Sequence, residues 1–378
     1  MKEIKVVLLS HFSLPFSGIA SWTTMMNYYL FDVNNQIDYV VCPDSELELK
    51  FSDRKKLNKL SLFDKIISKS DKTKRFNNYI NQLRKILSEE KNIIIQIIDN
   101  IGLLKAVLKF IQATKNRKRI YIQFYFHGFS SFPNSESILN EVDELVLLSK
   151  SSYQSFKQNN RLLSTKVSIN NNGVDGAIFK KIAKSDKALL RKNNNIDTVK
   201  IVFIWCSQDR KKKGLEILLS VWKQLLRDHN NMELLVIGTN KNIVIEGVRF
   251  LGPIPNNQLA KYYQLADFYL FPTLCHEGFG LSLVEALKCG LYCIASNNGS
   301  VAEVLNYGEY GKVIENPNLV EDWVSEIGLS IKDYIQNNKE NPYNKNIPED
   351  LYELKDWAKR YTEIINKAKE DFSIRLYI

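Results

Sequence analysis

The chain has 378 residues, of which 44% are hydrophobic and 25% charged, and its formal net charge is +10. The length suits two domains better than one core, the composition is typical of a soluble globular protein, and no apolar run approaches the roughly 18 residues that span a bilayer. The positive charge favours an anionic partner (a nucleotide, an anionic lipid or a nucleic acid), although a general bias toward Lys and Asn would explain it equally well.

The N-terminal half alternates strand and helix patterns. Apolar runs predict strands at 4–10, 37–42, 92–99, 119–126 and 144–149. Helical spacing between several of them predicts helices at 21–30, 101–113 and 151–158. Continuous apolar strands that alternate with helices are typical of a parallel sheet covered on both faces, so this half predicts a Rossmann-like domain.

The start of the chain and its cysteines indicate a cellular location. The first residues enter a strand pattern directly, and their apolar stretch is too short for a signal peptide. The five cysteines are odd in number and form no C-x-x-C pair, which favours free thiols in a reducing compartment and argues against a metal site. We therefore expect a cytoplasmic protein, at most peripheral on the inner face of the membrane.

The segment 50–86 is rich in Lys and Arg, and it has apolar residues at helical spacing at Leu60, Phe63, Ile66 and Ile67. A basic amphipathic stretch of this kind can lie on an anionic membrane surface. A solvated helix face followed by a loop explains the same pattern, and both interpretations stay open.

Two features follow strands of the first half, where ligands bind in open α/β sheets. Gly18 precedes the helix at 21–30, and a small residue there lets a phosphate approach the helix N-terminus. His127 follows the strand at 119–126 and could hydrogen-bond a substrate hydroxyl or cap the strand. We favour the functional interpretation for His127.

A second strand series follows the Asn- and Gly-rich interval 169–181. It comprises 200–207, 232–238, 248–252, 267–272 and 292–296. The sequence therefore predicts an N-terminal domain at 1–175 and a C-terminal domain at 176–348. A long amphipathic helix is expected at 349–372, with one apolar stripe made of Leu351, Leu354, Trp357, Ala358, Tyr361, Ile364 and Ile365.

Two loops of the second half carry the candidate chemistry. Arg210 and Lys213 follow the strand at 200–207 and precede a glycine and a helix, a position that suits a diphosphate. Glu277 precedes a Gly-Phe-Gly turn, and Glu285 lies on the helix that begins near Gly280. That helix N-terminus suits a phosphate, and the carboxylates suit sugar and ribose hydroxyls.

The stretch from Phe271 to Leu305 resembles the signature region of family 4 retaining glycosyltransferases. The E-x7-E pair of that family falls on Glu277 and Glu285, and its later acidic position falls on Glu303. The segments NNGVD, with Phe179, and FLGPIPNNQLAKYYQLAD are similar to its interdomain segment and its base-binding region. The similarity covers most of 169–310, and the first half matches more loosely through Gly18 and His127.

This resemblance implies the GT-B fold, an α/β architecture of two Rossmann-like domains that face a central cleft, with the C-terminal helix crossing back to the N-terminal, acceptor-binding domain. It implies sugar transfer from a nucleotide-sugar donor with retention, catalysed by His127, Arg210, Lys213 and Glu277. The donor-binding residues that it implies are Gly18, Pro253, Ile254, Phe279, Gly280, Leu281 and Glu285. One departure is that Ser207 and Gln208 stand where the family often has an arginine, and Arg210 is the candidate replacement.

The leading hypothesis is a hexosyltransferase, with a UDP-sugar favoured over a GDP-sugar, that acts on a lipid-linked or polysaccharide acceptor in bacterial surface glycan synthesis. We expect no cofactor and no metal, because the chain has no Asp-x-Asp and fixed cations can stabilise the departing diphosphate. The alternatives are a sugar-nucleotide epimerase and a catalytically silent binding subunit. Nucleic-acid binding is disfavoured because the basic segment lacks interleaved aromatic residues.

Overall fold

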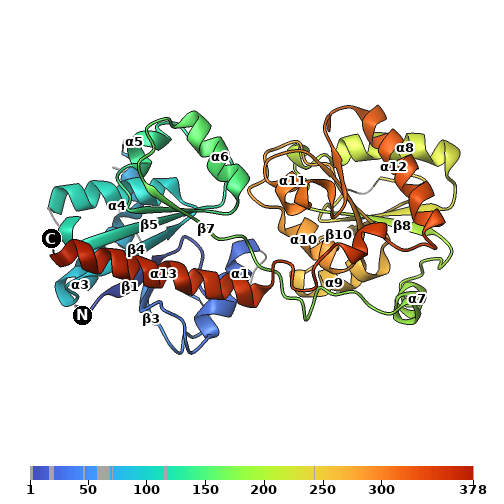
Figure 1. Cartoon of the computed structure of the whole chain (residues 1–378). Helices are drawn as coiled ribbons and strands as arrows, with labels where there is room; N and C mark the ends of the chain where they lie inside the picture. The colour runs from blue at the N-terminus through green and yellow to red at the C-terminus, as the bar shows by residue number, and fades with distance from the viewer. Residues whose placement is uncertain are drawn as a thin grey trace. The chain divides into compact units, whose positions relative to one another are not determined.

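A computed structural model of the chain describes residues 3–16, 21–45, 47–57, 69, 71–114, 117–241 and 243–377. It divides into two compact units (Figure 1). The first comprises Met1–Asn172 and Lys355–Ile378, and the second comprises Gly173–Leu354. Among the described helices, none combines the length and apolar character that a membrane span requires.

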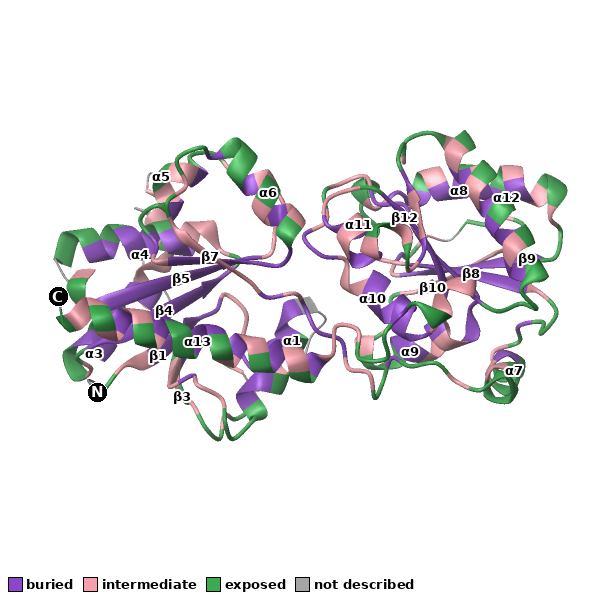
Figure 2. Ribbon diagram, in the orientation of Figure 1, coloured by how far each residue is buried: buried purple, intermediate pink, exposed green. Residues whose placement is uncertain are grey.

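The first unit contains a seven-stranded parallel sheet in the order β3-β2-β1-β4-β5-β6-β7. Its strands are β1 (Lys5–Leu9), β2 (Tyr39–Cys42), β3 (Asp53–Lys56), β4 (Ile93–Ile98), β5 (Ile120–Phe126), β6 (Glu144–Leu147) and β7 (Lys166–Ile169). Its helices are α1 (Ser21–Phe31), α3 (Asn77–Glu89), α4 (Ile101–Thr114), α5 (Ser135–Leu139), α6 (Lys150–Asn159) and α13 (Leu354–Tyr377). Every residue of β4 and β5 is buried, as expected for central strands covered on both faces (Figure 2).

Helix α13 packs on one face of the first sheet, and α3 and α4 contribute to the core on the other. The Tyr361 hydroxyl donates to Oε1 of buried Gln96 in β4 at 2.6 Å, and its ring lies 4.7 Å from that of Tyr29 in α1. The last helix of the chain is therefore part of the first unit. It begins five residues later than the sequence predicts, because Pro348 and the positive φ of Tyr352 (+50°) hold the preceding residues in a turn.

The second unit contains a six-stranded parallel sheet in the order β10-β9-β8-β11-β12-β13. Its strands are β8 (Ile201–Cys206), β9 (Met232–Ile237), β10 (Val248–Gly252), β11 (Phe268–Phe271), β12 (Tyr292–Ser296) and β13 (Lys312–Ile314). Its helices are α7 (Lys184–Asn193), α8 (Leu215–Asp228), α9 (Asn256–Leu265), α10 (Leu281–Lys288), α11 (Val301–Val304) and α12 (Val320–Gln336). Helices α8 and α12 form the core on one face, and α9 packs on the other through Tyr263 and Tyr269.

The segment 50–86 is only partly described. Its described parts include β3, at the edge of the first sheet, and the first ten residues of α3, whose Tyr79, Ile80, Leu83 and Ile86 are buried in the core. Leu60, Phe63, Ile66 and Ile67 lie outside the described residues. The apolar stripe of α3 therefore packs inside the protein and is not available to a membrane.

Candidate active site

The carboxyl ends of β8 and β11 bring Lys213 and Glu277 together in the second unit. Lys213 Nζ lies 2.5 Å from Glu277 Oε1, and the Thr273 hydroxyl donates to the same oxygen at 2.7 Å. The two side chains are 20% and 14% exposed, so the pair is reachable from solvent but shielded by its surroundings. A lysine and a carboxylate at this edge of a parallel sheet can contact a ligand together.

Two glycines allow the loops around Glu277 to pack closely against one another. Gly214 has φ +74°, and a Cβ there would lie 1.7 Å from the carbonyl oxygen of Pro272. Gly299 has φ +73°, and a Cβ there would lie 2.4 Å from the backbone nitrogen of Glu277. Both positions require glycine because of the conformation and the close approach of backbone. The loops after β8, β11 and β12 are consequently held against one another around Glu277.

Helix α10 presents its N-terminus at the same edge. Gly280 has φ +94° and precedes the first helical residue, Leu281, as the sequence predicts. The first N–H groups of a helix have no partner within it, and the helix dipole favours an anion there. Phe279 is buried edge-on against Tyr352, with ring centroids 5.0 Å apart, so its side chain packs and its backbone faces the turn.

Glu285, on α10, is 9% exposed, and burial raises its pKa to about 8, an effect that the neighbouring Tyr263 hydroxyl partly opposes. The Tyr263 hydroxyl is itself buried and has no hydrogen-bond partner within hydrogen-bond distance among the described residues. A buried carboxyl whose charged form is disfavoured, next to a buried hydroxyl, is costly unless a ligand engages these groups. This pair is the clearest sign of a polar ligand in the second unit.

The other predicted residues of the second unit lie along the same sheet edge or near it. Arg210 directly precedes the 3-10 turn Lys211–Lys213, and its side chain is exposed. Pro253 is exposed and Ile254 half-buried in the loop between β10 and α9. Glu303 lies in the short helix α11, half-buried.

In the first unit, His127 follows β5 and its backbone N–H donates to Asp99 Oδ1 at 3.2 Å. Its ring lies 6.1 Å from that of Trp22, and burial lowers its pKa, which favours the neutral imidazole. Gly18 lies outside the described residues.

Sequence reasoning missed four residues at these sites: His11, Asp99, Tyr263 and Thr273. His11 and Asp99 follow β1 and β4, so they share the carboxyl edge of the first sheet with His127. Nδ1 of His11 is buried without a hydrogen-bond partner, and Asp99 has φ +47°, which is unusual outside glycine. The sequence could have indicated His11, Asp99 and Thr273 because each of them lies at the end of a predicted strand or directly after it. Within the described residues, no cluster of three His, Cys, Asp or Glu side chains could hold a metal ion.

Comparison with known proteins finds one matching family model and several similar proteins. Residues 186–349 match the family model "Glycosyl transferases group 1". The chain is 32% identical to a phosphatidyl-myo-inositol mannosyltransferase of Propionibacterium freudenreichii over 101 residues, which is 27% of this chain and 26% of that protein. It is 25% identical to a lipopolysaccharide 1,2-N-acetylglucosaminetransferase of Salmonella typhimurium over 192 residues, 46% of this chain and 49% of that one. The matched segments thus span between a quarter and a half of these relatives.

Solved structures match over nearly the whole chain. Sucrose-phosphate synthase of Thermosynechococcus elongatus superposes with a TM-score of 0.75 at 13% identity, covering 98% of this chain and 100% of that one. Anabaena HepE in complex with UDP and glucose superposes with a TM-score of 0.70 at 15% identity, covering 97% of this chain and 100% of that one. At this identity the match concerns the fold. The predicted α/β fold of the GT-B type is confirmed, and the resemblance to group 1 glycosyltransferases is confirmed over residues 186–349.

Proposed function

We propose that this protein, whose residues 186–349 match the family model "Glycosyl transferases group 1", is a retaining glycosyltransferase that uses a nucleotide-sugar donor. The observation that carries the proposal is the set of groups at the carboxyl edge of the second sheet. Lys213, the N-terminus of α10 and the buried Glu285 offer a cation, backbone donors and a carboxyl to one ligand. A nucleoside diphosphate joined to a sugar needs each of these partners.

In this proposal the bond between the anomeric carbon and the diphosphate oxygen breaks, and a bond to the acceptor hydroxyl oxygen forms. The acceptor proton passes to the departing diphosphate. Lys213 and the first amides of α10 stabilise the negative charge that develops on the diphosphate, with Arg210 as a second cation. No metal is required for that step, because these groups are fixed before the reaction begins.

Glu277 and Glu285 take different roles. Glu277 holds the Lys213 ammonium in place and accepts hydrogen bonds from the transferred sugar. Glu285 accepts hydrogen bonds from the ribose hydroxyls, which favour its charged form against the burial that raises its pKa. In the first unit, we propose that the neutral imidazole of His127 hydrogen-bonds a substrate hydroxyl.

The names of the relatives suggest the substrates. Two of them are named for transfer to phosphatidyl-myo-inositol and to lipopolysaccharide, and HepE binds UDP and UDP-glucose. For this chain we propose a UDP-sugar ahead of a GDP-sugar, and a lipid-linked or polysaccharide acceptor of a bacterial surface glycan. The location proposed is the cytoplasm, peripheral to the inner face of the membrane.

The test is turnover of sugar nucleotides by the purified protein, with UDP- and GDP-sugars presented with and without lipid-linked and oligosaccharide acceptors. We expect release of nucleoside diphosphate that depends on the acceptor, persists in chelator, and yields a product with the anomeric configuration of the donor. Conversion of the donor alone to another sugar nucleotide would identify an epimerase. Nucleotide binding without turnover over the whole panel would indicate a silent binding subunit.

A further inference from the structure

A pocket of about 430 Å³ lies at the edge of the second sheet where its strands begin. It is lined by residues from five segments: 181–191, 198–201 at the start of β8, 264–267 before β11, 289–290 before β12, and 334–344 at the end of α12 and beyond. Lys213 and Glu277 follow the carboxyl ends of the same strands, so they lie at the opposite edge. The pocket is therefore separate from the candidate active site.

The walls of this pocket are strongly basic. Two carboxylates line it, Asp267 and Glu340, against six cationic side chains: Lys181, Lys184, Lys187, Arg191, Lys200 and Lys339. The excess is four positive charges. Three of the six cations, Lys181, Lys184 and Lys339, are exposed, and Lys187 and Lys200 are half-buried. Like charges that share one pocket repel one another, so a counter-charge would stabilise this arrangement.

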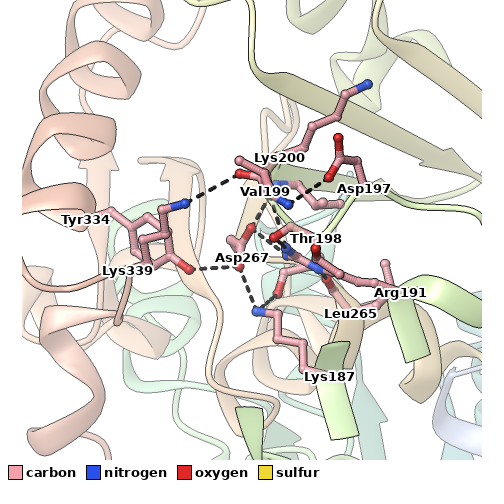
Figure 3. A network of polar contacts seen from close by, with 12 residues as sticks. Lys187, Arg191, Asp197, Thr198, Val199, Lys200, Leu265, Asp267, Tyr334 and Lys339 are labelled. Atoms are coloured by element: carbon pink, nitrogen blue, oxygen red, sulfur yellow. Dashed lines mark hydrogen bonds and ion pairs between the residues drawn. The ribbon is translucent and has the colours of Figure 1, made fainter. Parts of the chain in front are cut away.

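Both carboxylates are already engaged by neighbouring side chains. Asp267 accepts from Lys187 Nζ at 2.7 Å, from Arg191 Nη2 at 2.6 Å and from the Tyr334 hydroxyl at 2.8 Å (Figure 3). Burial alone would raise the pKa of Asp267, but the charges of Lys187 and Arg191 lower it below its ordinary value. Glu340 lies 2.5 Å from Lys184. Neither carboxylate is left to neutralise the other lysines.

The remaining lysines have weak partners. Lys181 Nζ and Lys339 Nζ each reach only a backbone carbonyl at 3.5 Å, of Asn344 and of Val199, and neither forms an ion pair within the described chain. Lys200 Nζ is 4.0 Å from Glu233, a carboxylate that Arg249 approaches more closely, at 2.6 Å. Lys181 is exposed, and partial burial of its ammonium group lowers its pKa, an effect that the charge of Glu349 partly opposes.

We propose that this pocket binds an anion that carries phosphate, with Lys181 and Lys339 as its principal ligands and Lys200 beside them. Its volume is within the range of about 300–1,000 Å³ that is usual for small-molecule sites. Lysine ammonium groups bind phosphate oxygens as mobile point charges, which suits a ligand with two or more negative charges. The phosphate belongs either to a free phosphorylated molecule or to a lipid headgroup, and the chemistry of recognition is the same.

Calorimetric titration with inorganic pyrophosphate tests the proposal, in protein carrying Lys213→Gln so that the candidate active site lacks its cation. Adding Lys181→Gln and Lys339→Gln should weaken binding at least about tenfold, since each lysine contributes a direct charge contact. Adding Lys223→Gln and Lys332→Gln instead removes the same charge from exposed positions of α8 and α12 that do not line this pocket, and should leave the affinity within about twofold. Flotation of the same three proteins with phosphatidylglycerol vesicles forms the second arm.

If the pocket variant loses pyrophosphate binding but keeps vesicle binding, the ligand is a free phosphorylated molecule. If it loses vesicle binding but keeps pyrophosphate binding, the ligand is a lipid phosphate. In both cases the control variant should bind like the parent protein. Equal behaviour of the pocket and control variants in both arms would overturn the proposal. Wild-type protein provides a measurement that does not depend on folding of the variants. Pyrophosphate should slow acetylation of Lys181 and Lys339 but not of Lys223, and the absence of protection would contradict the site. Because these readouts involve no sugar transfer, they stand or fall separately from the proposed function.

Discussion

The two edges of the second sheet use charge in opposite ways. At the carboxyl edge, one lysine is matched by one carboxylate, and a second carboxyl, Glu285, is buried with an unsatisfied hydroxyl beside it. At the other edge, Asp267 accepts hydrogen bonds from Lys187, Arg191 and the Tyr334 hydroxyl, and Lys181 and Lys339 form no ion pair within the described residues. Asp267 and its partners therefore stabilise the fold, whereas Glu285 at one edge and the lysines without ion pairs at the other are where a ligand is expected.

The largest effect on stability is expected at Asp267, at the edge where the strands of the second sheet begin. Asp267→Asn leaves Lys187 and Arg191 without their counter-charge in a buried setting, and should lower the free energy of unfolding by about 3–5 kcal/mol. Urea denaturation followed by tryptophan fluorescence measures it. Glu340→Gln, which alters an exposed pair in the same pocket wall, should change stability little. A similar loss in both variants would remove the distinction between the edges.

The carboxyl edge should show the largest effect on catalysis. Lys213→Gln removes the cation that faces the leaving diphosphate and should lower kcat by about 10²–10³-fold with little change in stability. Steady-state sugar transfer measures it, and Lys211→Gln, exposed in the same turn, is the matched control. Equal losses in the two variants would indicate a general effect of charge in the loop instead of a specific contact.

The pH dependence sharpens the contrast through Glu285. Because its folded pKa of about 8 lies above its ordinary value of 4.5, the folded protein holds a proton that the unfolded chain releases, and this group makes stability fall as the pH rises between those values. Donor binding that requires the carboxylate should strengthen by up to about tenfold per unit as the pH rises toward 8 and then level off. Calorimetric donor affinity across this range tests it, and Glu285→Gln should abolish the slope. A slope that persists in that variant would assign the titration to another group.

The smallest predicted effect concerns the positioning of Glu277. Thr273→Val removes the 2.7 Å hydrogen bond to Glu277 and should cost about 1–2 kcal/mol in transition-state stabilisation, a several-fold fall in kcat. Thr362→Val removes a comparable bond to Tyr29 in the first unit and should leave kcat unchanged. An equal fall of kcat in both would point to a loss of folded protein.

The central strands could be predicted from sequence because burial on both faces makes them continuously apolar. The three strands that the sequence did not reveal, β3, β7 and β13, are all edge strands: Asp53–Lys56 is entirely charged, and the other two are short and begin with lysine. The edge strand β10 (Val248–Gly252) was predicted because its sequence, VRFLG, is mostly apolar, so the apolar run and not the place in the sheet is what the sequence shows. The predicted start of the helix at 349–372 was five residues too early, because residues 349–353 continue the helical spacing of apolar residues but form a turn.

The candidate site divides in the same way. Lys213, Glu277, Gly280 and Glu285 lie in contiguous motifs beside strand ends, so their positions followed from sequence. Other contacts join residues far apart in the chain, which only the packed sheet brings together. They are the Tyr263 hydroxyl beside Glu285 and the hydrogen bond from Arg191 to Asp267. The excess of lysines in the second pocket has the same origin, because the residues that line it come from five separate segments of the chain.

The most direct test of the central claim is calorimetric binding of UDP and GDP to wild-type protein, to Glu285→Ala and to the Lys181→Gln, Lys339→Gln pair. We predict that one nucleotide binds the wild type, that Glu285→Ala weakens it at least about tenfold through loss of the ribose contact, and that the lysine pair leaves it unchanged. Nucleotide binding that survives Glu285→Ala undiminished, or that is lost with the lysine pair instead, would contradict the placement of the donor at the carboxyl edge of the second sheet.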